Sequence, residues 1–265
     1  MTKIFLFFFS AVLLFLSCGG DSSDDQGGVP TSNVPVYTPT VSKTYSHDTS
    51  AWTEGLFYSY DILYESTGLL NKSSLRKVDL ASGQVTQQID LASIYYGEGA
   101  TLMGDKIVQL TYTSGKGFVY DSNTFTLLDE FTYSTEGWGV TYDGEYLIMS
   151  DGTDILYYFY LDSNNDFIKV KEVKVTADGE AVTKLNELEY INGYIYANVW
   201  ETDRIAIIQT DGEVIGWIDL EEIASSLDCP GDIDALNGIA YNAEEDLLYV
   251  TGKYWCKLFA LQMVI

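Results

Sequence analysis

Histidine is almost absent from this 265-residue chain, and that scarcity limits the chemistry it can perform. The one histidine, His47, cannot supply a zinc site built from several imidazoles. A Ser-His-Asp relay would rest on the same side chain, which falls in an expected loop, where a histidine is usually no more than a polar residue. The sequence therefore predicts no metal site and no histidine-based relay.

Basic residues are also few: 14 Lys and Arg stand against 39 Asp and Glu, which gives a formal net charge of −25. Nucleic-acid affinity depends on Lys and Arg displacing counterions from phosphates. Neither nucleic acid nor an anionic membrane surface is therefore an expected partner. Such acidity ordinarily gives a soluble surface whose copies repel one another, and we expect a monomer.

Long hydrophobic runs are missing as well. The first apolar run covers residues 4–16, which is too short to span a bilayer. It follows Lys3 and precedes Ser17 and Cys18, an order typical of a bacterial lipoprotein signal. We expect Cys18 to become the acylated first residue of an exported protein, held by its lipid at a bacterial membrane on the periplasmic side or at the cell surface.

This interpretation divides the chain into three parts. Residues 1–17 are the expected signal peptide, residues 18–33 a flexible tether rich in Gly, Ser and Asp, and residues 34–265 a single folded domain. In that domain the sequence has only two cysteines, Cys229 and Cys256. Because the compartment would be oxidising, the pair is a candidate disulfide, and two buried thiols are the structural alternative.

Five segments of the domain repeat one pattern: a Gly or a polar residue, a short strand, a turn and a second apolar strand. The repeats start about 40–50 residues apart and lack helical periodicity, which is typical of the blades of a propeller. We therefore predict an all-β fold, a five-bladed β-propeller. The repeats begin at Glu54-Gly55, Glu98-Gly99, Trp138-Gly139, Asn186-Glu187 and Asn237-Gly238.

Three local signals accompany the repeats. Asn192-Gly193 lies between alternating apolar residues and predicts a hairpin whose turn residues both take positive φ. Residues 38–45 form a spare strand ahead of the first repeat, and the fifth repeat runs out of chain. We expect this strand to complete the fifth blade and to close the ring. Short helices are expected at 91–95 and 220–227.

The starts of the repeats mark a candidate site. The innermost strand of each blade lines the central channel of a propeller, and the loops at one face form the usual site. Six residues at these starts should therefore lie near one another: Glu54, Glu98, Trp138, Asn186, Glu187 and Asn237. Glu187 and Glu189 are candidates for a supporting role, in which they bind blade backbones.

Five aromatic residues lie beside these polar residues. A single aromatic residue in such a place is more often blade core. Five in matching positions favour a pocket that stacks a flat or amphipathic ligand. They are Trp52, Tyr96, Tyr112, Trp138 and Trp200.

An ordered series of short motifs, from about His47 to Leu261, resembles the plant-type glutaminyl cyclases, also called glutamine cyclotransferases. Ten motifs in one order make the resemblance specific. They are Trp52-Thr53-Glu54-Gly55-Leu56, Tyr64-Glu65-Ser66-Thr67-Gly68, Tyr96-Gly97-Glu98-Gly99, Gln109-Leu110-Thr111-Tyr112, Glu136-Gly137-Trp138-Gly139, Ser150-Asp151-Gly152, Leu185-Asn186-Glu187-Leu188-Glu189, Ala197-Asn198-Val199-Trp200, Leu236-Asn237-Gly238-Ile239-Ala240 and Thr251-Gly252-Lys253.

The resemblance implies a propeller enzyme, an aminoacyltransferase, that converts the N-terminal glutamine of a peptide, or free glutamine, into pyroglutamate with release of ammonia. It implies that Glu98 is the acid and base, with Asn186 and Lys253 as polar partners. No cofactor is expected. A structural divalent cation in the central channel is left open and is not predicted. Substrate contacts are expected from Trp52, Glu54, Tyr96, Tyr112, Trp138 and Trp200.

Three positions depart from the family pattern. Trp52 stands where the family often has Phe, and Tyr112 where it often has Trp, so both keep an aromatic face. Glu54 stands where the family often has Gln, and it adds a charge to the expected site. Because a fold does not fix a function, a non-catalytic propeller that binds peptides or glycans on its loop face is the alternative.

Overall fold

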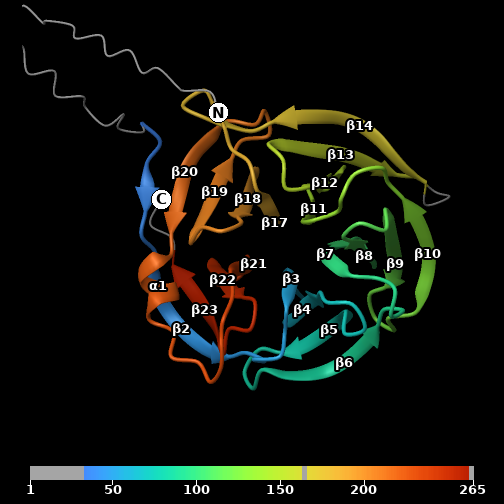
Figure 1. Ribbon diagram of the computed structural model, residues 1–265, viewed down its shortest axis with the longest axis horizontal. Helices are drawn as coiled ribbons and strands as arrows, with labels where there is room; N and C mark the ends of the chain where they lie inside the picture. The colour runs from blue at the N-terminus through green and yellow to red at the C-terminus, as the bar shows by residue number, and fades with distance from the viewer. Residues whose placement is uncertain (1–32, 163–165, 263–265) are drawn as a thin grey trace, which may run out of the picture. The chain divides into compact units, whose positions relative to one another are not determined.

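The computed structural model describes residues 33–162 and 166–262, which belong to one compact unit. Its main sheets are antiparallel and are arranged as five blades around one axis (Figure 1). The predicted five-bladed β-propeller is confirmed. The expected signal peptide and the tether up to residue 32 lie outside the described residues.

Within each blade the strands follow one another from the axis outward. Blade 1 contains β3 (Thr53–Ser59), β4 (Ile62–Thr67), β5 (Ser74–Asp79) and β6 (Gln84–Asp90). Blade 2 contains β7 (Gly97–Met103), β8 (Lys106–Thr111), β9 (Lys116–Asp121) and β10 (Leu127–Thr132). Blade 3 contains β11 (Val140–Tyr142), β12 (Leu147–Met149), β13 (Ile155–Leu161) and β14 (Phe167–Lys174). Blade 4 contains β17 (Leu185–Ile191), β18 (Tyr194–Val199), β19 (Arg204–Ile208) and β20 (Val214–Asp219). Blade 5 contains β21 (Leu236–Asn242), β22 (Leu247–Gly252), β23 (Lys257–Gln262) and β2 (Thr40–Ser46).

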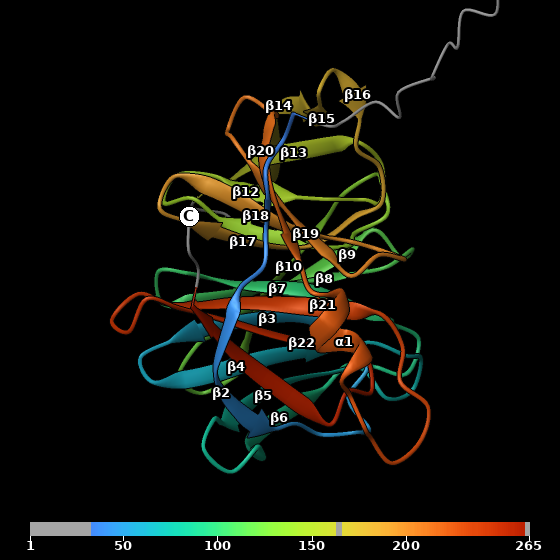
Figure 2. The same ribbon diagram turned by 90° about the vertical axis from the view of Figure 1, so that its left-hand side faces the viewer.

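The ring is closed by the N-terminal part of the described chain. Strand β2 pairs antiparallel with β23, so the expected spare strand does complete the fifth blade. Just before it, β1 (Val36–Tyr37) pairs parallel with β20 of blade 4, a contact that the sequence did not predict. Figure 2 shows this segment running from β20 to the edge of blade 5. The outer strands of both blades are therefore held together by one stretch of backbone.

Hydrophobic clusters fill the space between each pair of neighbouring blades. The alternation of side chains along a strand explains how one blade serves two clusters. Leu56 of β3 packs toward blade 5, while the next residue, Phe57, packs toward blade 2. In β22, Leu248 faces blade 4 and Tyr249 faces blade 1. Both faces of a blade are apolar, which is why its inner strands read as continuous hydrophobic runs.

The local signals were mostly reliable. Asn192 and Gly193 have φ of 50° and 94°, as the predicted hairpin turn requires. Helix α1 (Glu221–Ser225) forms inside the expected range of 220–227. The helix expected at 91–95 is wrong: this segment forms a turn with a bond from Tyr95 N–H to the Ala92 carbonyl.

Two further features complete the fold. A small hairpin, β15 (Thr176–Ala177) and β16 (Glu180–Ala181), follows blade 3 and was not predicted. Within residues 33–162 and 166–262, no helix is long and apolar enough to cross a membrane.

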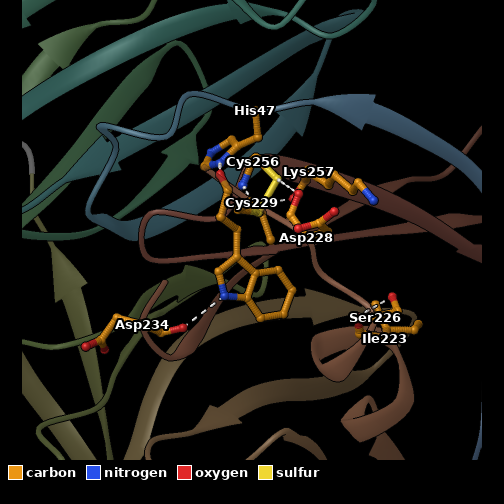
Figure 3. Close-up of a disulfide and its surroundings, with 10 residues drawn as sticks. His47, Ile223, Ser226, Asp228, Cys229, Asp234, Cys256 and Lys257 are labelled. Atoms are coloured by element: carbon orange, nitrogen blue, oxygen red, sulfur yellow. Dashed lines mark hydrogen bonds between the residues drawn. A yellow bond between two sulfur atoms is a disulfide. The ribbon is translucent and has the colours of Figure 1, made fainter. Parts of the chain in front are cut away.

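Cys229 and Cys256 form a disulfide, which decides between the two alternatives left by the sequence (Figure 3). The bridge ties the segment after α1 to the start of β23. Beside it, His47 is not the free polar residue that its loop position suggested. Its side chain is buried, with Nδ1 2.7 Å from the Trp255 carbonyl oxygen and Nε2 2.9 Å from Glu65 Oε1. His47 is therefore part of the ring closure.

The disulfide should contribute measurably to stability. It closes a loop with a sequence separation of 27 residues. Chain-entropy arguments give about 3–4 kcal/mol for a loop of this size, so Cys229→Ser with Cys256→Ser should lower the free energy of unfolding by about that amount. Urea unfolding of the oxidised protein and the double variant measures the difference. A loss under about 1 kcal/mol would show that the bridge does not constrain the unfolded chain as expected.

Candidate active site

A pocket of about 290 Å³ lies where loops and strand starts from several blades meet. All nine residues that the sequence predicted for catalysis or substrate contact line it, whereas Glu187 and Asn237, which were expected at the same place, do not. Among the described residues, Asp234 lines it too, and the sequence did not predict this contribution. The lining residues are Trp52, Glu54, Tyr96, Glu98, Tyr112, Trp138, Asn186, Trp200, Asp234 and Lys253.

Three of the polar lining residues, Glu54, Glu98 and Asn186, are positioned by irregularities at the starts of inner strands. Pairing shifts between Thr53 and Gly55 in β3, so that Glu54 is an extra residue in the strand. Equivalent shifts occur in β7 around Glu98, in β17 around Asn186 and in β21 around Asn237. A bulge turns a side chain away from the regular alternation, which would otherwise direct it between two blades. The same kind of bulge thus directs polar side chains from separate blades toward one pocket.

Glycines beside the bulges let the inner strands approach closely. A Cβ on Gly99 would lie 2.6 Å from the Trp138 carbonyl oxygen, and one on Gly139 would lie 2.1 Å from the Asn186 carbonyl oxygen. Gly99 instead donates a backbone hydrogen bond to that Trp138 carbonyl, with an N–O distance of 2.7 Å. Blades 2, 3 and 4 are therefore in backbone contact at the mouth of the channel.

Glu54 accepts hydrogen bonds from several elements and is only 1% exposed. Lys253 Nζ lies 2.8 Å and Trp52 Nε1 2.7 Å from its Oε1. Tyr96 donates its hydroxyl to the same oxygen at 3.1 Å, and Asn237 Nδ2 donates to Oε2 at 3.1 Å. The Lys253 ammonium also lies over the Trp52 ring, 4.9 Å from its centroid. Glu54 therefore connects blades 1, 2 and 5 at this pocket.

Glu98 is the second carboxyl group of the pocket and is 6% exposed. Burial raises its pKa well above the ordinary value, and the neighbouring Glu54 raises it further, while Lys253 acts in the opposite direction. Burial also raises the pKa of Glu54, but there the Lys253 ion pair and the other donors oppose the increase. Of the two groups, Glu98 is the one that holds a proton more readily.

Asn186 lines the pocket and has an unused side-chain acceptor. Its side chain is 4% exposed, and among the described residues nothing donates to its Oδ1. Its backbone is fixed, because Ser150 Oγ donates to the Asn186 carbonyl at 2.7 Å. A buried acceptor without a partner costs free energy unless a ligand satisfies it. Asn186 is therefore suited to receive an N–H group of a bound molecule.

The aromatic side chains form a chain of contacts around the pocket. Tyr96 and Tyr112 have ring centroids 5.8 Å apart, Tyr112 and Trp138 6.4 Å, and Trp138 and Trp200 5.6 Å. The indole N–H of Trp138 donates to Glu136 Oε2 at 3.0 Å. The predicted aromatic pocket is thus present, and its rings lie mostly edge to face.

Two acidic residues of β17, Glu187 and Glu189, do not line the pocket. Glu187 accepts backbone N–H groups of Leu56 at 3.1 Å and Ile239 at 2.8 Å, and so joins the inner strands of blades 1 and 5. Burial raises its pKa well above the ordinary value, and Glu189 raises it further. Burial also raises the pKa of Glu189 to about 8. The sequence expectation that these residues bind blade backbones is met by Glu187, and a backbone hydrogen bond from Tyr241 opposes the increase in the pKa of Glu189.

Asp234 reaches the pocket from the loop that the disulfide restrains. Its N–H donates to the Lys253 carbonyl, and Lys253 N–H donates to the Ala235 carbonyl, each at 2.9 Å. Trp255 Nε1 donates to the Asp234 carbonyl at 2.9 Å (Figure 3). No motif marks this loop, so its place at the pocket depends on tertiary contacts. Across the described part of the chain, no three His, Cys, Asp or Glu residues are grouped to hold a metal ion.

Fold and pocket together define a class: a five-bladed propeller whose loop face encloses a carboxyl pair, a lysine and an aromatic wall. The family model for glutamine cyclotransferase matches residues 12–263, and the chain belongs to this family. The resemblance that the short motifs indicated is thereby confirmed.

Known proteins agree with this assignment. A glutaminyl-peptide cyclotransferase of Arabidopsis thaliana is 42% identical over 224 residues, which cover 83% of this chain and 69% of the relative. The crystal structure of Myxococcus xanthus glutaminyl cyclase has a TM-score of 0.78 and 32% identity, and the match covers 88% of this chain and 100% of that one. Regucalcin, a calcium-binding protein from Agrobacterium tumefaciens, has a TM-score of 0.51 at 14% identity, with 86% and 95% covered, and is similar in fold alone.

The close approach of the inner strands can be tested at Gly139. Gly139→Ala would force the strands of blades 3 and 4 apart, and overpacking of this kind typically costs about 1–3 kcal/mol. We expect a loss of about 3 kcal/mol because the overlap is with backbone. Gly104→Ala is the comparison: its Cβ would meet nothing within 4 Å, but its φ is +65°, so only about 1 kcal/mol should be lost. Equal losses in urea unfolding would contradict this explanation of the strand contacts.

Proposed function

We propose that this chain is a glutaminyl-peptide cyclotransferase, an aminoacyltransferase that converts the N-terminal glutamine of peptides, or free glutamine, into pyroglutamate and ammonia. The observation that carries the proposal is the buried carboxyl group of Glu98 beside an unpaired Asn186 acceptor, in a chain 42% identical to the Arabidopsis glutaminyl-peptide cyclotransferase. The non-catalytic alternative has no observation of its own in its favour.

The reaction needs one group that moves a proton in both directions. The substrate's α-amine nitrogen attacks the carbon of its own γ-carboxamide and forms the five-membered ring. The C–N bond to the carboxamide nitrogen then breaks, and ammonia leaves. Glu98 takes a proton from the attacking nitrogen and returns it to the leaving one. A pKa raised by burial suits both roles, because the group must exist in both protonation states near neutral pH.

Asn186 and Lys253 act on the two ends of the reacting carboxamide. Asn186 Oδ1 accepts an N–H of the substrate and so fixes the orientation of the amine or the carboxamide. Lys253 uses one N–H on Glu54 and can direct another at the carbonyl oxygen, where negative charge develops. A preorganised donor of this kind is typically worth about 2.7–4 kcal/mol of transition-state stabilisation.

The aromatic wall of Tyr112, Trp138 and Trp200 is proposed to hold the glutamine chain folded. Cyclisation depends on bringing amine and carboxamide into a near-attack geometry, which is an effect of positioning. Trp52, Tyr96 and Glu54 would complete the substrate contacts. The nucleophile and the leaving group both belong to the substrate, so we propose that no metal or cofactor is needed for the chemistry.

The central test replaces Glu98 with glutamine, which keeps the shape and removes the proton transfer. General acid–base catalysis typically contributes about 10²–10⁴-fold, so Glu98→Gln should lower kcat by at least about 100-fold. KM should change much less. Ammonia release from a Gln-initiated dipeptide by the purified mature protein measures both values.

Glu130→Gln is the matched control. Glu130 lies in the same blade as Glu98 but on its outer strand, where it is exposed, pairs with half-buried Lys116 and does not line the pocket. Its replacement should leave kcat within about twofold. A nearly wild-type rate for Glu98→Gln would exclude Glu98 as the acid and base, and absence of activity in the wild type would reject the proposed function.

We further propose that the protein is exported as a monomer and anchored by lipid on Cys18, in the periplasm or at the cell surface. The order of Lys3, the apolar run 4–16 and Cys18 supports this. Cys18→Ala should move the protein from the membrane fraction to the soluble fraction, because the acyl chains provide the anchor. Cell fractionation with immunodetection measures the change, and an unchanged distribution would count against the lipid anchor.

A further inference from the structure

Two buried carboxyl groups and one buried ammonium group lie together in the pocket, whose third carboxyl group, that of Asp234, is exposed. Glu54 is 1% exposed, and Glu98 and Lys253 are each 6% exposed. With both carboxyls ionised, one negative charge would stay uncompensated, and burying such a charge is costly. A single proton shared by the carboxyl pair makes the three groups neutral together.

The hydrogen bonds decide which carboxyl carries that proton. Glu54 accepts from donors on both of its oxygens: Lys253 and Trp52 donate to Oε1, and Asn237 donates to Oε2. Hydrogen bonds from donors stabilise the ionised form of a carboxylate. The Glu98 carboxyl lines the same pocket, where Glu54 raises its pKa. Because the donors hold Glu54 in its ionised form, the single proton of the pair resides on Glu98.

We propose that Glu54 is a positioning residue of the reaction: its ionised carboxylate keeps the shared proton on Glu98 and orients it. This inference rests on the proposed function, and it explains why a glutamate occupies a position where the resemblance leads one to expect glutamine. The glutamate moves the ionisation of Glu98 closer to the pH range in which the substrate amine also ionises, so that Glu98 can both take and give a proton there. Glutamine at the same position would leave Glu98 free to ionise at lower pH.

Other charged groups also face Glu98 and set the size of the effect. Glu136 raises the pKa of Glu98, and Lys253 lowers it. Three tyrosines face the same carboxyl, and burial raises the pKa of each, so they stay neutral near pH 7. These tyrosines are Tyr96, Tyr112 and Tyr133.

The protonation of the pair should appear in the pH dependence of kcat/KM. Productive binding needs one proton shared between Glu98 and the substrate amine. The acid limb then reports Glu98, and the alkaline limb reports the amine, whose pKa is about 8. Removing a like charge lowers the pKa of the remaining acid, so the acid limb must move to lower pH.

Glu54→Gln keeps the shape of the side chain and tests this directly. We expect the acid limb of ammonia release to move down by about one pH unit or more, while the alkaline limb stays in place. Glu136→Gln removes an exposed carboxylate that accepts a hydrogen bond from the pocket residue Trp138, and it should move the acid limb by less than about 0.3 unit, because solvent screens that charge. A Glu54→Gln enzyme with reduced activity and unmoved limbs would show a merely structural role and overturn the proposal.

A measurement that needs no activity separates this inference from the proposed function. In ¹³C NMR of the glutamate δ-carboxyl carbons, Glu98→Gln identifies the Glu98 signal, and Glu54→Gln should lower the pH at which that signal titrates. Glu98→Gln should leave the titration of Glu54 almost in place, because Glu98 is still protonated and uncharged when Glu54 ionises; this arm stands even if Glu54→Gln fails to fold. An unmoved Glu98 signal in Glu54→Gln, or a Glu54 signal that moves to lower pH in Glu98→Gln, overturns the proposal. A Glu98 signal that moves to lower pH without any ammonia release supports the pair and rejects the proposed function.

Discussion

The close packing of the inner strands at the channel mouth is the constraint on which the rest of the structure depends. Blades 2, 3 and 4 meet through backbone atoms, because Gly99 and Gly139 have no Cβ to separate them. A bulge lies beside each of these contacts. It turns a polar side chain toward the pocket, whereas the regular alternation of a strand would bury that side chain between two blades. Glu98 and Asn186 thus share one pocket although they belong to different blades.

Two carboxyl groups, Glu54 and Glu98, are buried in one pocket, which is electrostatically unfavourable, and Lys253 compensates one of them. Glu54 and Lys253, 199 residues apart in the sequence, form an ion pair with an N–O distance of 2.8 Å. The pair leaves the second carboxyl, Glu98, with a raised pKa, which is the property that acid and base catalysis requires. The ring closure supports the same region, because the disulfide restrains the loop that carries Asp234.

The sequence predicted the blades because each one repeats an apolar pattern and turn signals such as Asn192-Gly193, which are local properties. It predicted which residues would meet, since topology brings repeat starts to one axis. It could not predict the partners of Glu54, which come from three blades and depend on side-chain packing. The hairpin β15–β16 was missed although Asp178-Gly179 has the positive φ values of such a turn. No sequence pattern marks strand β1 or Asp234, because their positions depend on tertiary contacts alone.

The central claim is that the bulges at the inner strand starts aim Glu98 and Asn186 at the reacting atoms of an N-terminal glutamine. A crystal structure of the Glu98→Gln variant with a Gln-initiated dipeptide tests it most directly. We expect the α-amine and the γ-carboxamide in the aromatic pocket, within about 3 Å of the side chain at position 98, with a substrate N–H on Asn186 Oδ1. A glutamine side chain bound outside this pocket, or inside it with Asn186 Oδ1 still unpaired, would contradict the claim.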